Sequence, residues 1–308
     1  MVEGPPVCGV VITYHPDDTV TENLRVMVRE CGRVVVVDNG SAAEVLAAMA
    51  AVPGVTLLPQ GRNVGLAAAL NLGVARAAEL GCEWAVTFDQ DSRPEPGMVP
   101  AMWAAHLTMP RAAVIGPRIH EEGSRPGNYR WVARHELWPL LFRRLACTGA
   151  DLPEVTMMVT SGSMIELAAW RQLGGFDGGL FIDYIDTDYC LRVIRAGRRV
   201  AVAGQAILQH RLGARQRRVF MGRDFRPTHH AAFRHYYIAR NRMVVWRRHA
   251  LAVPHWALFD LCFAVYNGFR VLAFEPNKWK KFRATWLGTW DGLCRRVGPC
   301  PKHRLETF

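Results

Sequence analysis

The sequence predicts an α/β fold, a mostly parallel sheet with helices on both faces. Three observations predict it. Runs of β-branched and apolar residues alternate with helical stretches through the first ninety residues. These runs are apolar throughout, as in strands that are covered on both faces. Polar turns follow them at what would be one edge of the sheet, where α/β proteins bind ligands.

The first elements follow in strict alternation. Each expected helix ends at a glycine, Gly32 for the first and Gly81 for the second. The expected strands are residues 7–13, 34–37, 55–58 and 84–88, and the expected helices are residues 19–31 and 66–80.

The middle of the chain is less regular. We expect strands at residues 112–116, 155–161 and 199–203, and helices at residues 165–173 and 186–196. Residues 121–151 mix Gly, Pro, Trp and Arg and suggest a variable acceptor-side loop with some helix. After Leu212 basic and aromatic residues dominate, and helical patterning follows to Phe274. This shift predicts a first domain at 1–213 and a basic, aromatic-rich helical C-terminal region at 214–308.

Composition and net charge indicate which classes of partner to expect. The chain has 308 residues, 50% of them hydrophobic and 21% charged, as is ordinary for a folded protein. Its formal net charge of +11 favours acidic partners such as nucleotides, nucleic acid or an anionic membrane surface. No nucleic-acid-binding module is recognisable, so a polyanion-binding protein without catalysis is a remote alternative.

The eight cysteines form no Cys-x-x-Cys pair, which predicts reduced core residues of a cytosolic protein and neither a disulfide frame nor a zinc site. No signal peptide is expected at the N-terminus. The best membrane-spanning candidate, residues 250–269, contains Pro254, His255, Asp260 and Asn267. We interpret it as a core or interfacial helix, because a spanning helix needs about 20 predominantly apolar residues.

Two aspartates follow the fourth expected strand. Asp89 and Asp91 are two residues apart, so their side chains point the same way. Hard oxygen ligands at a sheet edge suit Mg²⁺ or Mn²⁺ holding a diphosphate. For Asp-x-Asp alone a solvated turn is the more frequent explanation, and only the flanking sequence overturns it.

Two further turns fall at the same edge. In Asp38-Asn39-Gly40-Ser41 the acid can accept a hydrogen bond from a base imide or a ribose hydroxyl, and Ser41 can also serve as a helix N-cap. Residues 61–67 open a helix whose amides favour a phosphate, and Arg62 would add a charge-assisted contact. Packing of a small-residue helix explains the same glycines.

A second carboxylate cluster consists of Asp183, Asp186 and Asp188. Asp186 lies at a helix start, where capping is the simpler interpretation, yet three acids exceed what a cap requires. One of them, ionised and facing a sugar hydroxyl, would serve as a general base. Arg192 is one turn beyond Asp188 and is expected to pair with it. His210 follows a strand-like run and is either structural or the third protein ligand of a metal.

These motifs occur in one order along the chain: Val11-Ile12-Thr13-Tyr14, Val37-Asp38-Asn39-Gly40-Ser41, Asn63-Val64-Gly65-Leu66-Ala67, Phe88-Asp89-Gln90-Asp91-Ser92, Ser161-Gly162-Ser163, Gly174-Gly175-Phe176-Asp177 and Phe181-Ile182-Asp183-Tyr184-Ile185-Asp186-Thr187-Asp188. As an ordered set they resemble a family 2 glycosyltransferase with the GT-A nucleotide-diphospho-sugar transferase fold, over roughly residues 7–213. The Asp-Gln-Asp form, the string around Asp186 and the later segments 236–242 and 288–293 resemble bacterial rhamnosyltransferases.

The resemblance implies a role for each matching position. The positions implied at the nucleotide are Thr13, Tyr14, Asp38, Asn39, Arg62, Asn63 and Asp89. Asp91, with Asp89 and His210, would hold Mg²⁺ or Mn²⁺. Asp186 matches the catalytic base of inverting members, in many of which a glutamate precedes that aspartate. Here Ile185 precedes it and Asp183 lies three residues earlier, so the base is Asp186 or Asp183.

The sequence thus suggests an inverting, metal-dependent transferase that moves L-rhamnose from dTDP-rhamnose to a cell-envelope glycan or a polyprenyl-diphosphate-linked acceptor. UDP-galactofuranose and UDP-glucose are the alternative donors, and no nucleic acid is expected as a partner. The arginines and tryptophans of the C-terminal third suggest a platform on anionic lipids, which would make the protein cytoplasmic and peripheral at the inner face of the cell membrane. A solvated basic face or a homodimer contact explains them as well.

Overall fold

The structure is a computed structural model, and it describes residues 6–121, 129–210, 218–220, 223–225 and 230–305. The chain forms two compact units. The first, here called the sheet unit, comprises residues 1–133, 144–178 and 185–211. The second, the helical unit, comprises residues 134–143, 179–184 and 212–308. The short 3-10 helix η1, Gly178–Leu180, lies where the chain passes from one unit to the other.

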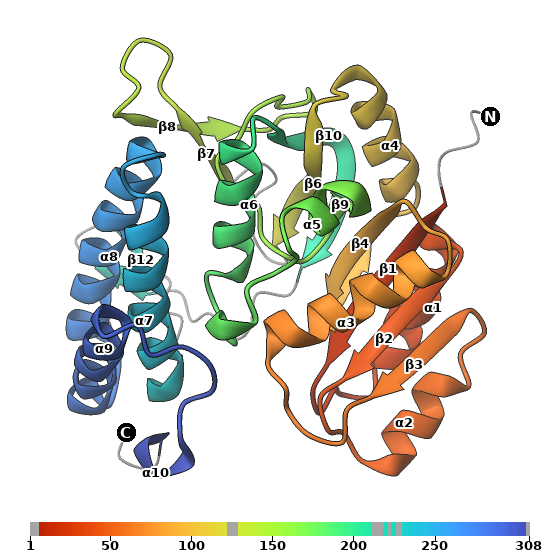
Figure 1. Cartoon of the computed structure of the whole chain (residues 1–308), viewed down its shortest axis with the longest axis horizontal. Coiled ribbons are helices and arrows are strands. Elements are labelled where there is room, and N and C mark those ends of the chain that lie inside the picture. Colours follow the sequence, from red (N-terminus) through yellow and green to blue (C-terminus); the bar gives the residue numbers. More distant parts are fainter. Residues whose placement is uncertain (1–5, 122–128, 211–217, 221–222, 226–229, 306–308) are drawn as a thin grey trace. The chain divides into compact units, whose positions relative to one another are not determined.

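An eight-stranded sheet organises the sheet unit, in the order β3-β2-β1-β4-β9-β6-β10-β5 (Figure 1). The pairings are parallel except where β9 and β5 take part, so the expectation of a mostly parallel sheet is confirmed. The strands are β1 Val7–Thr13, β2 Val34–Asp38, β3 Val55–Pro59, β4 Trp84–Asp89, β5 Ser92–Pro94, β6 Ala112–Glu121, β9 Ser163–Glu166 and β10 Arg199–His210.

Helices pack on both faces of this sheet, and the alternation of strand side chains assigns each face. On β1, Val11 belongs to the core shared with α1 and α4, whereas Val10 faces α3. A Cβ on Gly73 of α3 would lie 2.4 Å from Val10 Cγ1, so glycine is what lets α3 approach the sheet. The helices are α1 Val20–Cys31, α2 Ala43–Ala50, α3 Leu66–Glu79, α4 Met98–Thr108, α5 Leu167–Gln172 and α6 Ile185–Arg195.

The first six predicted elements are confirmed to within one residue or so, but the middle of the chain differs. The strand predicted at 155–161 is wrong, because Val155 and Thr156 donate single backbone hydrogen bonds to Val200 and Val132 and the strand forms later, as β9. The helix predicted at 165–173 starts only at Leu167, since β9 occupies the residues before it. Within 121–151, the described residues form a hairpin of β7, Arg130–Arg134, and β8, Phe142–Ala146, and no helix.

The helical unit is built on α7 Ala232–His249, α8 Pro254–Phe274, α9 Lys278–Leu293 and the short α10 Lys302–Leu305, with the two-stranded β11 Arg218–Phe220 and β12 Arg223–Phe225. α7 and α9 approach closely at two glycines. A Cβ on Gly288 would lie 2.2 Å from the carbonyl oxygen of Tyr236, and one on Gly292 would lie 2.5 Å from that of Arg240. The glycines of the 288–293 segment therefore act as contact points between helices.

Two arginines that the sequence placed on a basic surface lie largely inside the helical unit instead, since Arg240 is buried and the Arg242 side chain is only 14% exposed. Arg240 donates to the carbonyl oxygens of Gly179, Leu180 and Gly298, and Arg242 pairs with Asp260 at 3.0 Å. The carbonyl and carboxylate acceptors offset the free-energy cost of taking the charged guanidinium groups out of water. Arg215, Arg217 and Arg226 lie outside the described residues, as do the side chains of Arg218 and Arg223.

The tryptophans divide in the same way. Trp256 is buried and Trp246 donates from Nε1 to Asp260 at 2.7 Å, whereas Trp279, Trp286 and Trp290 are exposed. All eight cysteines are free, and six of them are buried, as predicted.

Among the described helices, α8 is long and apolar enough, by length and composition alone, to be a membrane-span candidate. Its two charged residues, Asp260 and Arg270, are both buried in the helical unit. Asp260 accepts hydrogen bonds from Tyr184 and Arg242 as well as from Trp246, and these contacts tie the helix to α7 and to the segment before α6.

Candidate active site

The carboxyl ends of β1, β2 and β4 lie side by side at one edge of the sheet. Thr13 is paired in register with Asp38, and Ile12 with Asp89. Asp38 also pairs with Pro59 of β3, so the three polar turns that the sequence singled out, after β2, β3 and β4, start from the same edge of the sheet, as the parallel topology predicts.

Asp38 is fully buried and its carboxylate is saturated. Oδ1 accepts hydrogen bonds from the backbone N–H groups of Gly40 and Ser41 at 2.8 and 2.7 Å. Oδ2 accepts from the hydroxyls of Thr13 and Ser41 at 2.7 and 2.5 Å. Burial acts to raise the pKa of Asp38, but these hydrogen bonds outweigh it and hold the pKa below its ordinary value. Asp38 therefore holds the turn in place. Ser41 bonds to Asp38 within this turn, and the residue at the N-cap of α2 is Ala42.

The turns after β2 and β3 are joined to each other. Gln60 N donates to the carbonyl oxygen of Asp38 at 2.8 Å, and Val64 N donates to Asn39 Oδ1 at 3.3 Å. Gly40, at φ 112°, lies so close to Arg62 that a Cβ would come within 3.4 Å of its Cα. Asn39 is buried in this contact, whereas Arg62 and Asn63 are exposed at the start of α3.

The Asp-Gln-Asp turn is anchored by its middle residue. Gln90 Oε1 accepts from Tyr14 N at 2.8 Å, and the Gln90 carbonyl accepts from Asn23 Nδ2 at 3.1 Å. Asp89 is half-buried and Asp91 is exposed. Gln90 thereby fixes the two aspartates relative to the exposed Tyr14, a role that the motif alone does not indicate.

His210 ends β10 and stands opposite Ser92 in the antiparallel pairing of β10 with β5. Its backbone is therefore next to the Asp-Gln-Asp turn, while its side chain lies outside the described part of the chain. Among the described side chains, no group of three or more His, Cys, Asp or Glu residues is gathered as a metal site.

The second carboxylate cluster separates into three environments. Asp188 is fully buried and accepts from Arg192 Nε at 2.8 Å, so the predicted pair is confirmed. Asp183, at φ 63°, accepts from Arg234 Nε and Nη2 at 2.9 to 3.2 Å. Burial raises the pKa of Asp183, and Arg234 offsets part of that effect. Asp186 lies in the first turn of α6 and accepts from Thr187 N at 2.7 Å.

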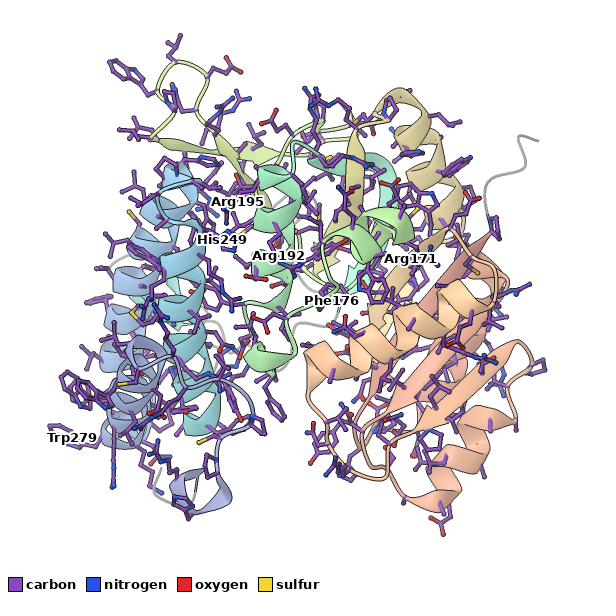
Figure 2. The ribbon with its side chains drawn as sticks, in the orientation of Figure 1. Arg171, Phe176, Arg192, Arg195, His249 and Trp279 are labelled. Atoms are coloured by element: carbon purple, nitrogen blue, oxygen red, sulfur yellow. The ribbon has the colours of Figure 1, made fainter. Side chains whose placement is uncertain are left out.

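Two side chains clamp the loop between α5 and η1, a role that the sequence indicates for neither of them. Asn71 of α3 donates from Nδ2 to the carbonyl oxygen of Phe176 and accepts from Phe176 N, both at 2.8 Å. Arg192 donates to the carbonyl oxygens of Leu173 and Gly175, both at 2.7 Å (Figure 2). The clamps join the last turn of α6 to α3 through this loop.

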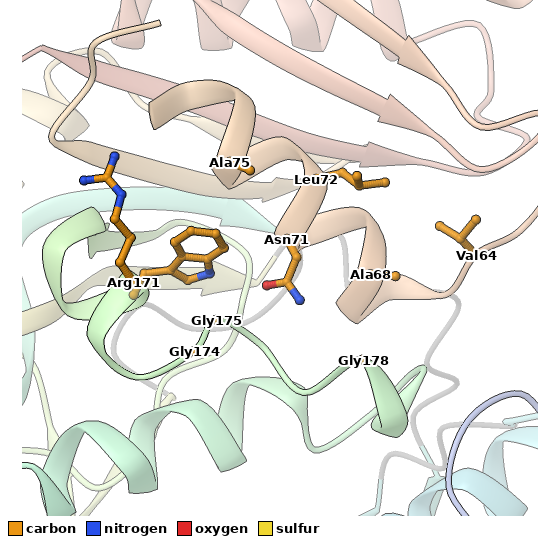
Figure 3. A pocket seen from close by; sticks show the side chains of 10 residues that line it. Val64, Ala68, Asn71, Leu72, Ala75, Arg171, Gly174, Gly175 and Gly178 are labelled. Atoms are coloured by element: carbon orange, nitrogen blue, oxygen red, sulfur yellow. The ribbon is translucent and has the colours of Figure 1, made fainter. Parts of the chain in front are cut away.

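A groove of about 720 Å³ lies between α3 and the clamped loop (Figure 3). One wall is a face of α3 that includes Ala68, Asn71 and Leu72, and the other includes Trp170 and Gly175. The indole N–H of Trp170 is buried and has no hydrogen-bond partner among the residues that the structure describes. The groove is mostly apolar with a few polar groups, which is the usual character of a small-molecule site.

Comparison with known proteins identifies the family. Residues 10–174, more than half of the chain, match the family described as Glycosyl transferase family 2. The chain belongs to this family. It is a glycosyltransferase, and the resemblance drawn from its motifs is confirmed.

Curated relatives match this glycosyltransferase over most of their length. It is 25% identical over 292 residues to dTDP-rhamnosyl transferase RfbF of Shigella flexneri, covering 93% of this chain and 95% of the relative. It is 27% identical over 281 residues to N-acetylglucosaminyl-diphospho-decaprenol L-rhamnosyltransferase of Mycobacterium tuberculosis, covering 81% of this chain and 88% of the relative.

The solved structure of residues 1–349 of TarS from S. aureus is similar with a TM-score of 0.61 and 13% identity, covering 97% of this glycosyltransferase and 82% of that chain. Together with the family match, it confirms the GT-A fold with helices after the sheet.

Proposed function

We propose that this glycosyltransferase transfers L-rhamnose from dTDP-rhamnose to a lipid-linked cell-envelope glycan, with inversion at the anomeric carbon. The observation that carries the proposal is the joining of the three turns at one sheet edge, in a chain that aligns along 93% of its length with a dTDP-rhamnosyl transferase.

On the donor side, Tyr14, Arg62 and Asn63 are exposed at this edge and can contact a nucleotide directly. Thr13, Asp38 and Asn39 are buried, so they act by shaping the turns that present those side chains. Arg62, four residues before α3, suits a diphosphate, because the N–H groups and dipole of the following helix N-terminus favour anions.

The donor set fits a divalent cation. Asp91 is exposed at the same edge, Asp89 precedes it at the end of β4, and the His210 backbone stands beside their turn. Carboxylate oxygens with one imidazole suit Mg²⁺ or Mn²⁺. When bound, such an ion would supply positive charge to the diphosphate leaving group.

For the base, we propose Asp186. It would take the proton from the acceptor hydroxyl, and the oxygen would attack the anomeric carbon from the face opposite the diphosphate. Asp183 is less suited to this role because Arg234 already engages its carboxylate with three hydrogen-bond contacts.

We place the acceptor sugar in the groove beside α3, whose clamped loop leads to the helix that carries Asp186. Trp170, whose indole offers an apolar surface, is among the residues that line this groove. The similarity to an N-acetylglucosaminyl-diphospho-decaprenol L-rhamnosyltransferase supports a lipid-linked acceptor and a peripheral place on the inner face of the membrane. We propose that residues 1–213 form the domain that performs the chemistry and that residues 214–308 form a separate helical region.

The deciding experiment is a panel of nucleotide sugars, comprising dTDP-rhamnose, UDP-galactofuranose and UDP-glucose. Each is tested for Mn²⁺-dependent protection against thermal unfolding and for slow hydrolysis. At equal concentration a tighter ligand raises the melting temperature more, so the native donor should give the largest shift. The proposal fails if a UDP-sugar protects and dTDP-rhamnose does not.

A further inference from the structure

The tip of the β7–β8 hairpin turns large apolar side chains into solvent. Leu137 is 80% exposed, Trp138 64%, Leu140 66% and Leu141 45%. Pro139 lies between them and is also exposed. Five consecutive apolar residues outside a core are unusual in a soluble surface loop, and such clusters mark interaction sites.

The backbone of this tip is fixed although its side chains are not packed. His135 N donates to the Leu141 carbonyl and Leu141 N to the Trp138 carbonyl, both at 2.9 Å. The Nδ1 atom of His135 accepts from the N–H groups of Leu137 and Trp138 at 3.3 and 3.4 Å. Backbone polar groups that are already paired can enter an apolar medium at much lower cost.

The hairpin packs against α8 next to its tip. The ring of Phe142 lies edge-on to Phe259 of α8 with centroids 5.3 Å apart, and Phe259 stacks on Phe263 at 6.0 Å. By their spacing Leu261, Val265, Phe269 and Leu272 share another face of α8, and all four are exposed.

α9 adds an aromatic stripe and positive charge to the helical unit. Trp279, Phe282, Trp286 and Trp290 recur every three or four residues and are exposed, and Trp279 points away from the bundle (Figure 2). The exposed charged residues of α8 and α9 are all basic, namely Lys278, Lys280 and Arg283, because their acidic residues are buried.

We propose that residues 137–141 insert into the acyl region of an anionic lipid bilayer. The proposal deepens the proposed function, since it rests on a lipid-linked acceptor for its purpose. A convex apolar tip with tryptophan nearby and basic side chains on the same unit matches the layers of an anionic leaflet, which are apolar within and negative at the headgroups. A second copy of the chain is the competing occupant.

The first test locates the tip. Leu140→Cys is made in a Cys262→Ser/Cys294→Ser background, which leaves only buried native cysteines, and is labelled with an environment-sensitive fluorophore. With phosphatidylglycerol vesicles the emission should shift to the blue and be quenched by nitroxides on the acyl chains. The control is Ala48→Cys, exposed on α2 of the sheet unit, which should show neither effect. A label at position 140 that stays in water overturns the proposal.

The second test removes the apolar groups. Leu137→Ser/Leu140→Ser should weaken partition into these vesicles by roughly tenfold to a hundredfold. The control Leu107→Ser, on an exposed leucine of α4, should leave partition unchanged. Part of the wild-type binding should survive high salt, because apolar insertion is not screened. Insertion is rejected if the double variant partitions like the wild type. It is also rejected if the wild type is a dimer that the double variant dissociates and the control variant does not.

The two proposals can fail separately. Vesicle binding needs neither donor nor acceptor, so it reports on insertion even if dTDP-rhamnose proves to be the wrong donor. Conversely, the double variant should keep donor protection and transfer to a water-soluble acceptor while losing transfer to a vesicle-embedded one.

Discussion

Arg234 of α7 donates from Nε and Nη2 to the carboxylate of Asp183, with N to O distances of 2.9 to 3.2 Å. The pair connects the segment before α6 to the first long helix of the helical unit. Asn241 of α7 reinforces the connection by donating to the carbonyl oxygens of Leu180, Ile182 and Asp183. The two carboxylates that the sequence leaves as rival bases therefore differ in what already holds them.

We expect Asp186→Asn to reduce transfer by about 10²–10⁴-fold, the usual effect of losing a general base. Donor binding and the melting temperature should stay close to wild type, because the amide is isosteric. Asp183→Asn should instead lower the melting temperature, since it removes the carboxylate charge that Arg234 contacts. Single-turnover transfer and thermal unfolding of both variants test this. An active Asp186→Asn beside a folded but inactive Asp183→Asn would reverse the assignment.

We expect Asp91→Ala to abolish metal-dependent donor binding, because Asp91 is the exposed carboxylate at the diphosphate edge. Calorimetry with dTDP in the presence of Mn²⁺ and in the presence of EDTA measures the effect. The matched control is Asp18→Ala, an exposed aspartate in the segment before α1. Equal Mn²⁺-dependent affinity in the Asp91 variant and the wild type would remove Asp91 from the metal site.

Much of the sheet edge could be predicted from the sequence, because buried parallel strands are short, apolar and followed by their polar turns. Val34–Asp38 and its turn illustrate this, since both the strand and the clustering of its last residue follow from local pattern and topology. The 155–161 run has the same local pattern but no strand. There Gly162, at φ 81° and packed against Pro117 and Leu208, places the turn, and those neighbours are distant in sequence.

The clamps on the groove could not be predicted for the same reason. Asn71 and Phe176 are 105 residues apart, and a carboxamide in an alanine-rich helix carries no local signal of a tertiary partner.

The prediction for Arg240 was wrong in the opposite direction. Its sequence context predicts a basic surface, but carbonyl oxygens of residues 179, 180 and 298 surround its guanidinium, and tertiary acceptors decide whether a charge can be buried.

We expect the stability of the protein to fall in acid partly through Asp38. Its pKa is held below the ordinary value of 3.8, so its contribution is present above about pH 4 and is lost as the pH falls through the folded-state pKa. Asp38→Asn should therefore be less stable at neutral pH and show a flatter acid limb. Urea unfolding between pH 7 and pH 3 measures both. Parallel pH curves for variant and wild type would contradict the hydrogen-bonded role of the carboxylate.

We expect Gly288→Ala to destabilise the helical unit by roughly 1–3 kcal/mol, since its Cβ would lie 2.2 Å from a backbone oxygen of α7 and overpacking forces the helices apart. Gly268→Ala is the matched control. It lies in α8 with no atom within 4 Å of the added Cβ, so better helix propensity should make it neutral or slightly stabilising. Denaturant unfolding of the two variants distinguishes a close helix contact from a general preference for glycine.

We expect Ala68→Trp to block acceptor binding while leaving donor binding unchanged. Ala68 lines the groove between α3 and the clamped loop, and an indole there would occupy space that the acceptor sugar needs. The apparent KM for acceptor should rise by roughly tenfold or more, as expected when a pocket loses its fit. Protection by dTDP-rhamnose should match wild type, because none of the residues proposed at the nucleotide lines this groove. Ala48→Trp, on the exposed face of α2, controls for the added bulk. If Ala68→Trp transfers with an unchanged acceptor KM, the acceptor does not use this groove, and if donor protection is lost as well, the groove belongs to the donor.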